Sequence, residues 1–134
     1  MAGLVLKLAP KERLMINGTV IENGDSRARI LVKTPDARIL RLRDAIHPDQ
    51  ANTPVSRLCY QVQLIVSGDA EGEDSRRAAL RGIEQLSQVF DDRDSRRILS
   101  DATEALVDGR AHRALRCLRD LLPREARLMA AHGQ

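Results

Sequence analysis

The residues with the clearest chemical potential are basic, and they gather between positions 27 and 43. This segment holds six basic side chains against one acid, Asp36. The six are Arg27, Arg29, Lys33, Arg38, Arg41 and Arg43. Guanidinium groups bind phosphates through paired hydrogen bonds and stack on bases, so clustered arginines on strands favour single-stranded RNA as a ligand. The residues alone leave open a second interpretation, a solvated sheet face whose arginine stems cover apolar surface.

The net charge of the chain, +3, is confined to its first part. Residues 1–50 hold nine basic and six acidic residues, whereas residues 51–134 hold thirteen of each. Aromatic residues make up only 1% of the chain, namely Tyr60 and Phe90, so RNA bases could not be held on an aromatic platform. This charge permits a polyanion partner without requiring one. Such a partner would be bound through cations of the first part of the chain and not through aromatic rings.

No arrangement of residues points to catalysis. The sequence contains no glycine-rich phosphate loop, no His-Glu-x-x-His motif and no Cys-x-x-Cys pair. Its three histidines, His47, His112 and His132, are far apart and have no metal-ligand spacing. We therefore predict a protein that is not an enzyme and that uses no metal and no cofactor.

The cysteines and the apolar segments favour the cytoplasm. Cys59 and Cys117 fall on apolar stripes of expected helices, so both are expected to be buried, reduced thiols. No apolar run approaches the roughly 20 residues that span a bilayer. The first ten residues lack the basic lead and the cleavage site of a signal peptide. We expect a cytoplasmic protein without a membrane partner.

Short apolar segments between turn signals predict strands in the first 45 residues. The expected strands cover residues 4–8, 13–16, 19–22, 29–33 and 38–43. Asn17-Gly18 and Asn23-Gly24 tolerate the positive φ angles of tight hairpin turns, and Thr34-Pro35-Asp36 predicts a further turn. In the last strand, alternation places Arg41 and Arg43 on one sheet face, at a spacing close to that of successive phosphates.

Helical periodicity begins after Thr53, which is expected to cap a helix with Pro54 at its first position. The expected helices cover residues 55–67, residues 74–90, a third segment capped by Asp94 and ended by Gly109, and a fourth from Ala111 to just before Pro123.

These elements predict an α+β protein in two parts. A small antiparallel β-sheet module, residues 1–46, is expected to bind RNA, and a bundle of four to five helices, residues 47–134, to dimerise or bind a partner. A strand-rich module of this size cannot bury its own faces well. It must therefore pack on the helices, dimerise or do both. We expect a homodimer, with strand exchange as the favoured arrangement, because exchange would give two identical basic edges.

Ten short segments follow one another in order over nearly the whole chain: residues 3–13, 16–18, 20–25, 40–48, 53–55, 59–60, 68–69, 80–86, 114–115 and 121–125. In this order they resemble the FlbT family of flagellin translation regulators. The resemblance implies a post-transcriptional regulator that binds the 5′ untranslated region of flagellin messenger RNA and controls its translation and stability. Some members of that family repress and promote transcript decay, whereas others activate. It also implies a FlaF-like protein as a partner.

A second set, residues 4–6, 12–16, 28–35 and 42–46, is similar to the strands of the CsrA family of RNA-binding dimers. There RNA lies along the first and last strands, which implies contacts from Leu4, Leu6 and Arg43, with Arg41 as a neighbouring candidate. The chain departs from that family by a shorter middle hairpin and one inserted residue near Arg38. With the basic residues of the strands added, the candidate RNA-binding set is Leu4, Leu6, Lys7, Arg29, Lys33, Arg41 and Arg43.

The helical part supports an alternative function. The apolar stripes of the expected helices exceed what one small sheet can cover, so a helical partner could lie in a groove among them. In this alternative the protein is an interaction adaptor that binds FlaF or flagellin, and its effects on messenger RNA are indirect.

Overall fold

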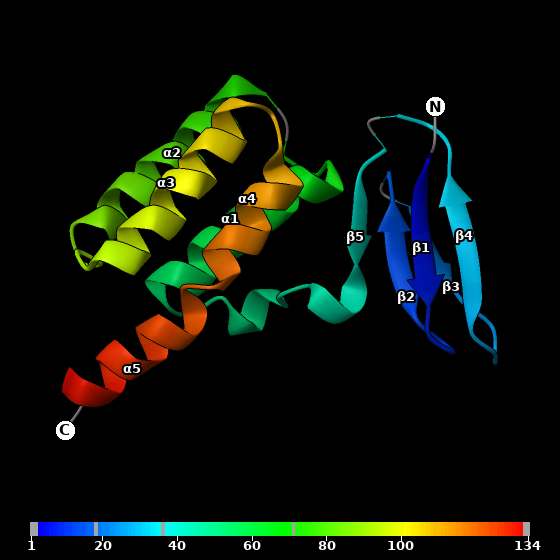
Figure 1. The fold of residues 1–134 in the computed structure, drawn as a ribbon, viewed down its shortest axis with the longest axis horizontal. Coiled ribbons are helices and arrows are strands. Elements are labelled where there is room, and N and C mark those ends of the chain that lie inside the picture. The colour runs from blue at the N-terminus through cyan, green and yellow to red at the C-terminus, as the bar shows by residue number, and fades with distance from the viewer. Residues whose placement is uncertain (1–2, 18, 36, 71, 133–134) are drawn as a thin grey trace. The chain divides into compact units, whose positions relative to one another are not determined.

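The computed structural model describes residues 3–17, 19–35, 37–70 and 72–132. Within these ranges, five antiparallel strands are followed by five α-helices (Figure 1), which confirms the predicted α+β class. The chain divides into two compact units, one formed by residues 1–45 with 66–69 and the other by residues 46–65 with 70–134.

The first unit contains two antiparallel sheets. β1 (Leu4–Leu8) pairs with β4 (Ala28–Val32). β2 (Arg13–Ile16) lies between β3 (Thr19–Glu22) and β5 (Ile39–Arg41). The hydrogen-bonded partners are therefore mostly not the strands that follow each other in sequence.

Side chains of both sheets form the core of this unit. Its members are Leu6, Leu8 and Leu14, with Ile16, Ile30, Val32 and Ile39 packed against them. These positions alternate along each strand, because every second side chain of a strand points to the same face. The core is small, and other apolar side chains of this unit, such as Leu4 on β1 and Val20 on β3, remain more than half exposed.

The two Asn-Gly pairs have different outcomes. Asn17 has a φ of 50° and Ile16 pairs with Thr19, so the predicted hairpin turn is confirmed, although its Gly18 lies outside the described residues. The hairpin predicted at Asn23-Gly24 is wrong, because β3 and β4 belong to different sheets. Asn23 instead anchors a crossing between the sheets, where its amide donates to the carbonyls of Ala9 and Ser26 at 2.8 and 2.9 Å. The turn expected at positions 34–36 includes Asp36, which also lies outside the described residues.

The last strand is shorter than predicted. β5 ends at Arg41, and a 3-10 helix follows over Leu42–Asp44. Leu14 of β2 pairs with Arg41, and the neighbouring Arg13 is the first residue of β2, so β2 offers little more strand to pair with. The prediction that Arg41 and Arg43 share a sheet face is therefore wrong.

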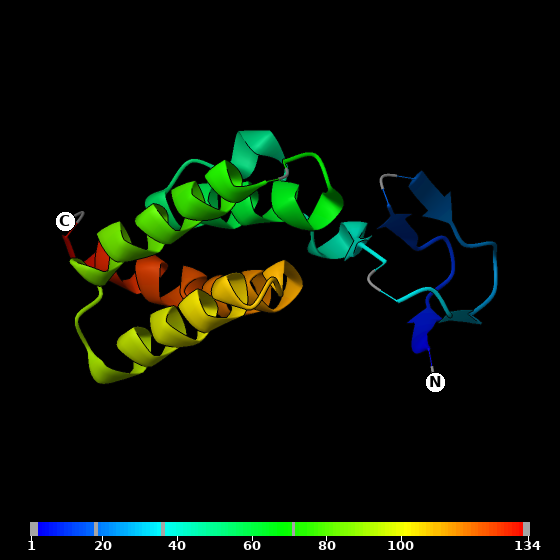
Figure 2. The same cartoon turned by 90° about the horizontal axis from the view of Figure 1, so that it is seen from above.

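The second unit is a helical bundle. Its elements are a 3-10 helix (Pro48–Gln50), α1 (Pro54–Ser67), α2 (Glu73–Ser87), α3 (Arg93–Val107), α4 (Ala111–Arg119) and α5 (Leu122–His132), with the last residues of α1 counted in the first unit. Figure 2 shows α1 and α2 as one layer and α3 and α4 as the other. Buried residues line the inner faces, as the predicted stripes require: Val55, Leu58, Cys59, Val62, Ile83, Leu86, Leu99, Ala102, Leu106, Leu115 and Leu118. No helix in the described ranges is both long and apolar enough to cross a bilayer.

Helix starts follow the predicted capping chemistry, with one correction. Thr53 caps α1, because its Oγ1 accepts a hydrogen bond from the Ser56 backbone N–H at 3.2 Å. The cap of α3 is Asp92 and not Asp94, since the Asp92 carboxylate accepts from the Ser95 N–H at 3.1 Å and the helix begins one residue later. Hydrogen bonding with Ser95 lowers the pKa of the Asp92 carboxyl.

The predicted fourth helix is interrupted, and a fifth one follows. α4 ends at Arg119, and α5 starts at Leu122 with Pro123 in its first turn, where a missing N–H is tolerated. Side chains of this first turn join α5 to two other helices. Glu125 accepts from the Val55 N–H at 2.9 Å and from the Thr53 hydroxyl, while Arg124 lies 3.2 Å from Asp92.

Candidate nucleic-acid interface

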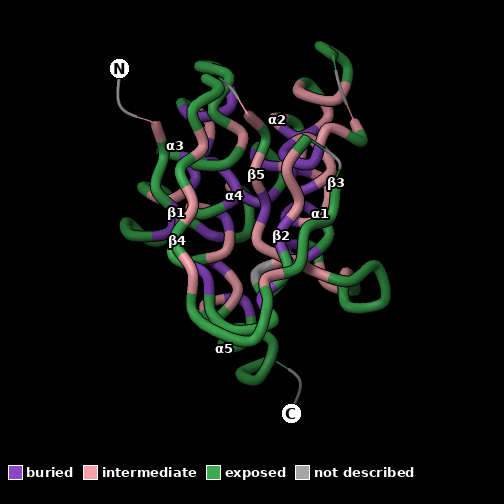
Figure 3. The backbone as a smooth tube through the Cα atoms, turned by 90° about the vertical axis from the view of Figure 1, so that its right-hand side faces the viewer, coloured by how far each residue is buried: buried purple, intermediate pink, exposed green. Residues whose placement is uncertain are grey.

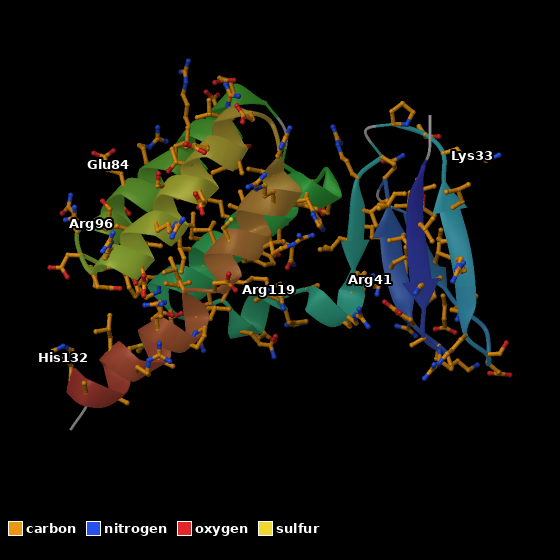
Figure 4. All side chains as sticks on the ribbon, viewed as in Figure 1. Lys33, Arg41, Glu84, Arg96, Arg119 and His132 are labelled. Atoms are coloured by element: carbon orange, nitrogen blue, oxygen red, sulfur yellow. The ribbon has the colours of Figure 1, made fainter. Side chains whose placement is uncertain are left out.

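One face of the β1–β4 sheet points away from the core, and we call it the outer face. It consists of Val5, Lys7, Arg29, Leu31 and Lys33, which alternate with the core-facing residues of β1 and β4. The strand register places Val5 opposite Leu31 and Lys7 opposite Arg29. Val5 and Leu31 are each 50% exposed. Figure 4 shows Lys33, directly after β4, projecting away from the two strands. The outer face thus presents an exposed apolar pair beside a row of cations.

In the described part of the chain, the cations of the outer face have no acidic partner. Among the described residues, none forms an ion pair with Lys7, Arg29 or Lys33. Lys7 and Arg29 are also direct cross-strand neighbours, and like charges at such positions destabilise a sheet. A bound anion would relieve this repulsion, so the outer face is chemically suited to phosphates.

Basic residues around the other sheet are neutralised within the protein. Lys11 lies 2.8 Å from a carboxylate oxygen of Asp25, and Arg13 lies 2.8 Å from one of Glu22. Both pairs are exposed, and such pairs add little to stability. They nevertheless lower the positive charge that these two residues present to a ligand.

Arg41 and Arg43 converge on one buried carboxylate. The Glu12 side chain is only 4% exposed, and its Oε2 lies 3.3 Å from Nη1 of Arg41 and 3.7 Å from Nε of Arg43. The other oxygen of Glu12 accepts a hydrogen bond from the Ala9 N–H at 2.9 Å. Arg41 also donates from Nη2 to the Lys7 carbonyl oxygen at 2.8 Å. These contacts join β5, β1 and the turn that begins at Ala9.

The structure divides the residues that the sequence predicted as one RNA-binding set. Lys7, Arg29 and Lys33 share the outer face, and Leu4 is exposed at the start of β1. The Leu6 side chain, in contrast, points into the core and is 9% exposed. Arg41 and Arg43 are gathered around Glu12 and do not belong to the outer face.

Sequence reasoning missed three residues that shape this region. Val5 and Leu31 complete the outer face. Each lies two residues from a charged residue of the same strand, Lys7 or Arg29, and this spacing could have placed them on the solvent side. Glu12 was missed because it immediately follows a turn and carries no pattern that predicts burial.

The composition of the outer face limits the ligand chemistry. Both aromatic residues of the chain, Tyr60 on α1 and Phe90 after α2, lie in the helical unit. The outer face can therefore offer phosphate contacts and aliphatic surface, but no ring for base stacking. Among the described residues, no group of three or more His, Cys, Asp or Glu side chains is placed to hold a metal ion.

Both cysteines are free thiols, and one is deeply buried as predicted. Burial raises the pKa of the Cys59 thiol to about 12, so it carries almost no thiolate at neutral pH. Cys117 is half-buried, which makes the prediction of burial only partly correct for it, and burial also raises its pKa. Neither residue has the low pKa of a reactive nucleophile.

Comparisons with known proteins agree on one family. The family model described as "Flagellar protein FlbT" matches residues 4–129. The "Probable flagellum biosynthesis repressor protein FlbT" of Rhodopseudomonas palustris strain TIE-1 is 31% identical over 129 residues, covering 95% of this chain and 98% of that protein. The protein of the same name from Mesorhizobium japonicum is 29% identical over 129 residues, covering 96% of this chain and 86% of that protein. The "Flagellum biosynthesis repressor protein FlbT" of Caulobacter vibrioides ATCC 19089 is 36% identical over 70 residues, 52% of this chain and 49% of that protein.

No solved structure matches the chain significantly.

Proposed function

The chain belongs to the FlbT family of flagellar proteins, and from this premise we propose that it binds the 5′ untranslated region of flagellin messenger RNA through its outer face. In this proposal the cytoplasmic protein controls the translation and the stability of the transcript. Relatives in this family are named flagellum biosynthesis repressors, which makes repression the expected sign and indicates a regulator rather than an enzyme.

The observation that carries the proposal is the pair of unneutralised cations, Lys7 and Arg29, facing each other beside Val5 and Leu31. Phosphates of a bound strand would lie on the cations, and ribose and base edges would contact the aliphatic pair. Duplex RNA hides its bases in the stack, whereas an unpaired leader exposes them. The mixture of charged and apolar side chains therefore favours single-stranded RNA.

The direct test is a binding titration of the full chain against the flagellin leader at several salt concentrations. For single strands the logarithm of the binding constant falls with the logarithm of salt by roughly 0.7 per neutralised phosphate. The variant Lys7→Gln/Arg29→Gln should weaken binding and reduce this slope by about 1.4, because two contacts are removed.

A matched control makes the titration specific. Lys11→Gln/Arg13→Gln removes the same charge from the same unit, but from cations that are already paired with acids. Arg96→Gln removes an exposed cation from α3. Both controls should bind nearly as the unmodified protein does. If the control and the outer-face variant lose equal binding affinity, the loss reflects net charge alone, and the proposed site is refuted.

The proposal includes a homodimer formed by the first unit. Its core is small, and five apolar side chains of its strands are at least 40% exposed: Leu4, Val5, Val20, Ile21 and Leu31. Exposed apolar strands at a sheet edge favour pairing with another chain. β3 lies at such an edge, and all four of its residues are exposed.

An adaptor function is the second candidate, and α5 carries the observation that favours it. All residues from 126 to 132 are exposed, including Leu128 and Met129 (Figure 3). Half a helix without packing is marginal by itself, and its apolar side chains suit a groove on a protein partner. The proposed partner is a FlaF-like protein or flagellin.

The adaptor candidate is tested by exchanging the exposed apolar pair of α5. In the full chain, Leu128→Ser/Met129→Ser should weaken capture of purified FlaF-like protein or flagellin, while Ala126→Ser/Ala130→Ser should not. Retention of both partners by the first variant would remove α5 as the docking element.

A further inference from the structure

We propose that Arg41 is a positioning residue for the outer face, which affects RNA binding through Lys7 and does not itself contact a phosphate. This inference rests on the proposed function, because it assigns a role at the same surface. It also separates Arg41 from Arg43, which strand alternation had predicted to share one sheet face.

The hydrogen bond between Arg41 and Lys7 connects the two sheets of the first unit. Nη2 of Arg41, on β5, donates to the carbonyl oxygen of Lys7, on β1, at 2.8 Å. The backbone of Lys7 is thereby held from the edge of β1 that does not face β4. Because the direction of the Cα–Cβ bond in a strand follows from its backbone, this contact holds the part of β1 from which Lys7 projects to the outer face.

The charge of Arg41 is already engaged. Its side chain is 19% exposed, and Nη1 lies 3.3 Å from a carboxylate oxygen of Glu12, which is 4% exposed. A phosphate that recruited this guanidinium would draw it from a buried carboxylate, and a buried charge left without its partner is strongly unfavourable. Arg41 is therefore a poor phosphate ligand, although it belongs to the basic stripe.

Arg43 is a natural comparison within the same cluster. It lies 3.7 Å from the same Glu12 oxygen, but its side chain is 58% exposed and it belongs to the 3-10 helix after β5. Among the described residues, Arg43 has no hydrogen bond to β1. A substitution of Arg43 thus perturbs the Glu12 cluster without releasing Lys7.

A double-mutant cycle tests the inference with the full chain and the flagellin leader. Arg41→Lys keeps the positive charge, but a single ammonium group cannot contact both the Glu12 carboxylate and the Lys7 carbonyl as the guanidinium does. We expect it to weaken binding about three- to tenfold, which lies at the lower end of the coupling between residues in direct contact. In the Lys7→Gln background Arg41→Lys should have almost no effect on binding, because the ammonium group through which Arg41 acts is absent. Arg43→Lys should change binding less than about twofold in either background.

Each other outcome has a defined meaning. Equal weakening by Arg41→Lys in both backgrounds would show an independent RNA contact and overturn the inference, as would no effect in either. If Lys7→Gln by itself leaves binding unchanged, the proposed function fails together with the inference. If Lys7→Gln weakens binding and the effects of the two substitutions simply add, the inference is refuted while the proposed function stands.

Glu12→Gln supplies a second measurement that does not depend on Arg41→Lys folding well. This change releases the charge of Arg41 while keeping its hydrogen bond to Lys7. The salt slope should remain unchanged if Arg41 only positions Lys7. The measurement is made in an Arg43→Gln background, which removes the other arginine beside Glu12. There, an increase of the slope by roughly 0.7 would show that the released Arg41 guanidinium binds a phosphate, and the inference would then be wrong.

Discussion

The guanidinium of Arg41 lies 3.3 Å from the buried carboxylate of Glu12, and this contact determines which cations of the first unit remain available to a ligand. Arg41 and Arg43 are drawn toward one acid, whereas Lys7, Arg29 and Lys33 remain without one among the described residues. The positive charge of the outer face is consequently available to a ligand from β1, from β4 and from Lys33 directly after β4.

Loss of Arg41 alone should destabilise the protein more than loss of both charges of the Arg41–Glu12 pair. Arg41→Met leaves Glu12 buried with only Arg43 nearby, so we expect a loss of about 2 to 4 kcal/mol in the free energy of unfolding. Arg41→Met/Glu12→Gln should recover part of this loss, because the unpaired charge is gone. Urea unfolding of both variants checks the prediction, and a double variant less stable than the single one would contradict it.

Glu125 should stabilise the start of α1 from a distance of 70 residues in sequence. Glu125→Ala removes the acceptor of the Val55 N–H and the Thr53 hydroxyl. We expect it to lower the free energy of unfolding by about 1 to 3 kcal/mol, the usual cost of a buried donor without a partner. The control Glu84→Ala removes an exposed carboxylate of α2 (Figure 4) and should change stability by less than about 0.5 kcal/mol. Equal effects would show that the α5 contact contributes nothing.

Cys59 should make the protein less stable in alkali. Its folded pKa is raised to about 12 from the ordinary value of 9.0, so above pH 9 the unfolded chain releases this proton while the folded chain keeps it. The stabilising contribution is complete below pH 9 and is lost as pH rises toward 12. Between pH 8 and pH 10 the expected loss is about 1 kcal/mol relative to Cys59→Ala. Parallel pH dependences of the two proteins would contradict the prediction.

Lys11 occupies a backbone conformation that a side chain disfavours. Its φ is 62°, and it follows Pro10 in a turn closed by a hydrogen bond from the Glu12 N–H to the Ala9 carbonyl at 3.1 Å. Glycine adopts this conformation without strain, so Lys11→Gly should raise the free energy of unfolding by about 0.5 to 1 kcal/mol. Thermal melting provides the measurement. Lys11→Ala, which loses the same ion pair with Asp25 but keeps the strain, is the control and should not be stabilised.

Val20 should contribute to the proposed homodimer. Its side chain is 55% exposed on β3, the edge strand of the second sheet. Sedimentation equilibrium should show a dimer for the unmodified chain, and Val20→Lys should weaken it at least about tenfold by placing a charge at an apolar contact. Thr19→Lys adds the same charge one residue away and should weaken the dimer less. A monomeric unmodified chain at all concentrations would refute the dimer.

Local patterns predicted the helical unit well. The apolar stripe of α1, its Thr53 cap and the end of α3 at Gly109, where φ is 76°, follow from interactions within a few residues. The errors there are small and also local. The α3 cap is Asp92, two residues before the predicted Asp94, and Pro123 lies in the first turn of α5, where the sequence predicted only the end of a helix.

The strand unit was harder to predict, because its pairing is not local. The segments themselves were found nearly at their true bounds, but β1 pairs with β4 across two intervening strands. A second Asn-Gly pair suggested a hairpin where the chain instead crosses between sheets. The turn residues predict that the chain can reverse at Asn23, but they do not determine which strand then pairs with which.

The sequence by itself determined the α+β class, the faces of the helices, the family to which the chain belongs and the concentration of positive charge in its first part. Only the tertiary structure decided which of those charges are neutralised. Ion pairs depend on distances between residues far apart in sequence, and Glu12 meets Arg41 and Arg43 only after β2 and β5 have paired. For this reason the basic stripe of the sequence is divided in space: Arg41 and Arg43 lie beside Glu12, whereas Arg29 and Lys33 lie on the outer face.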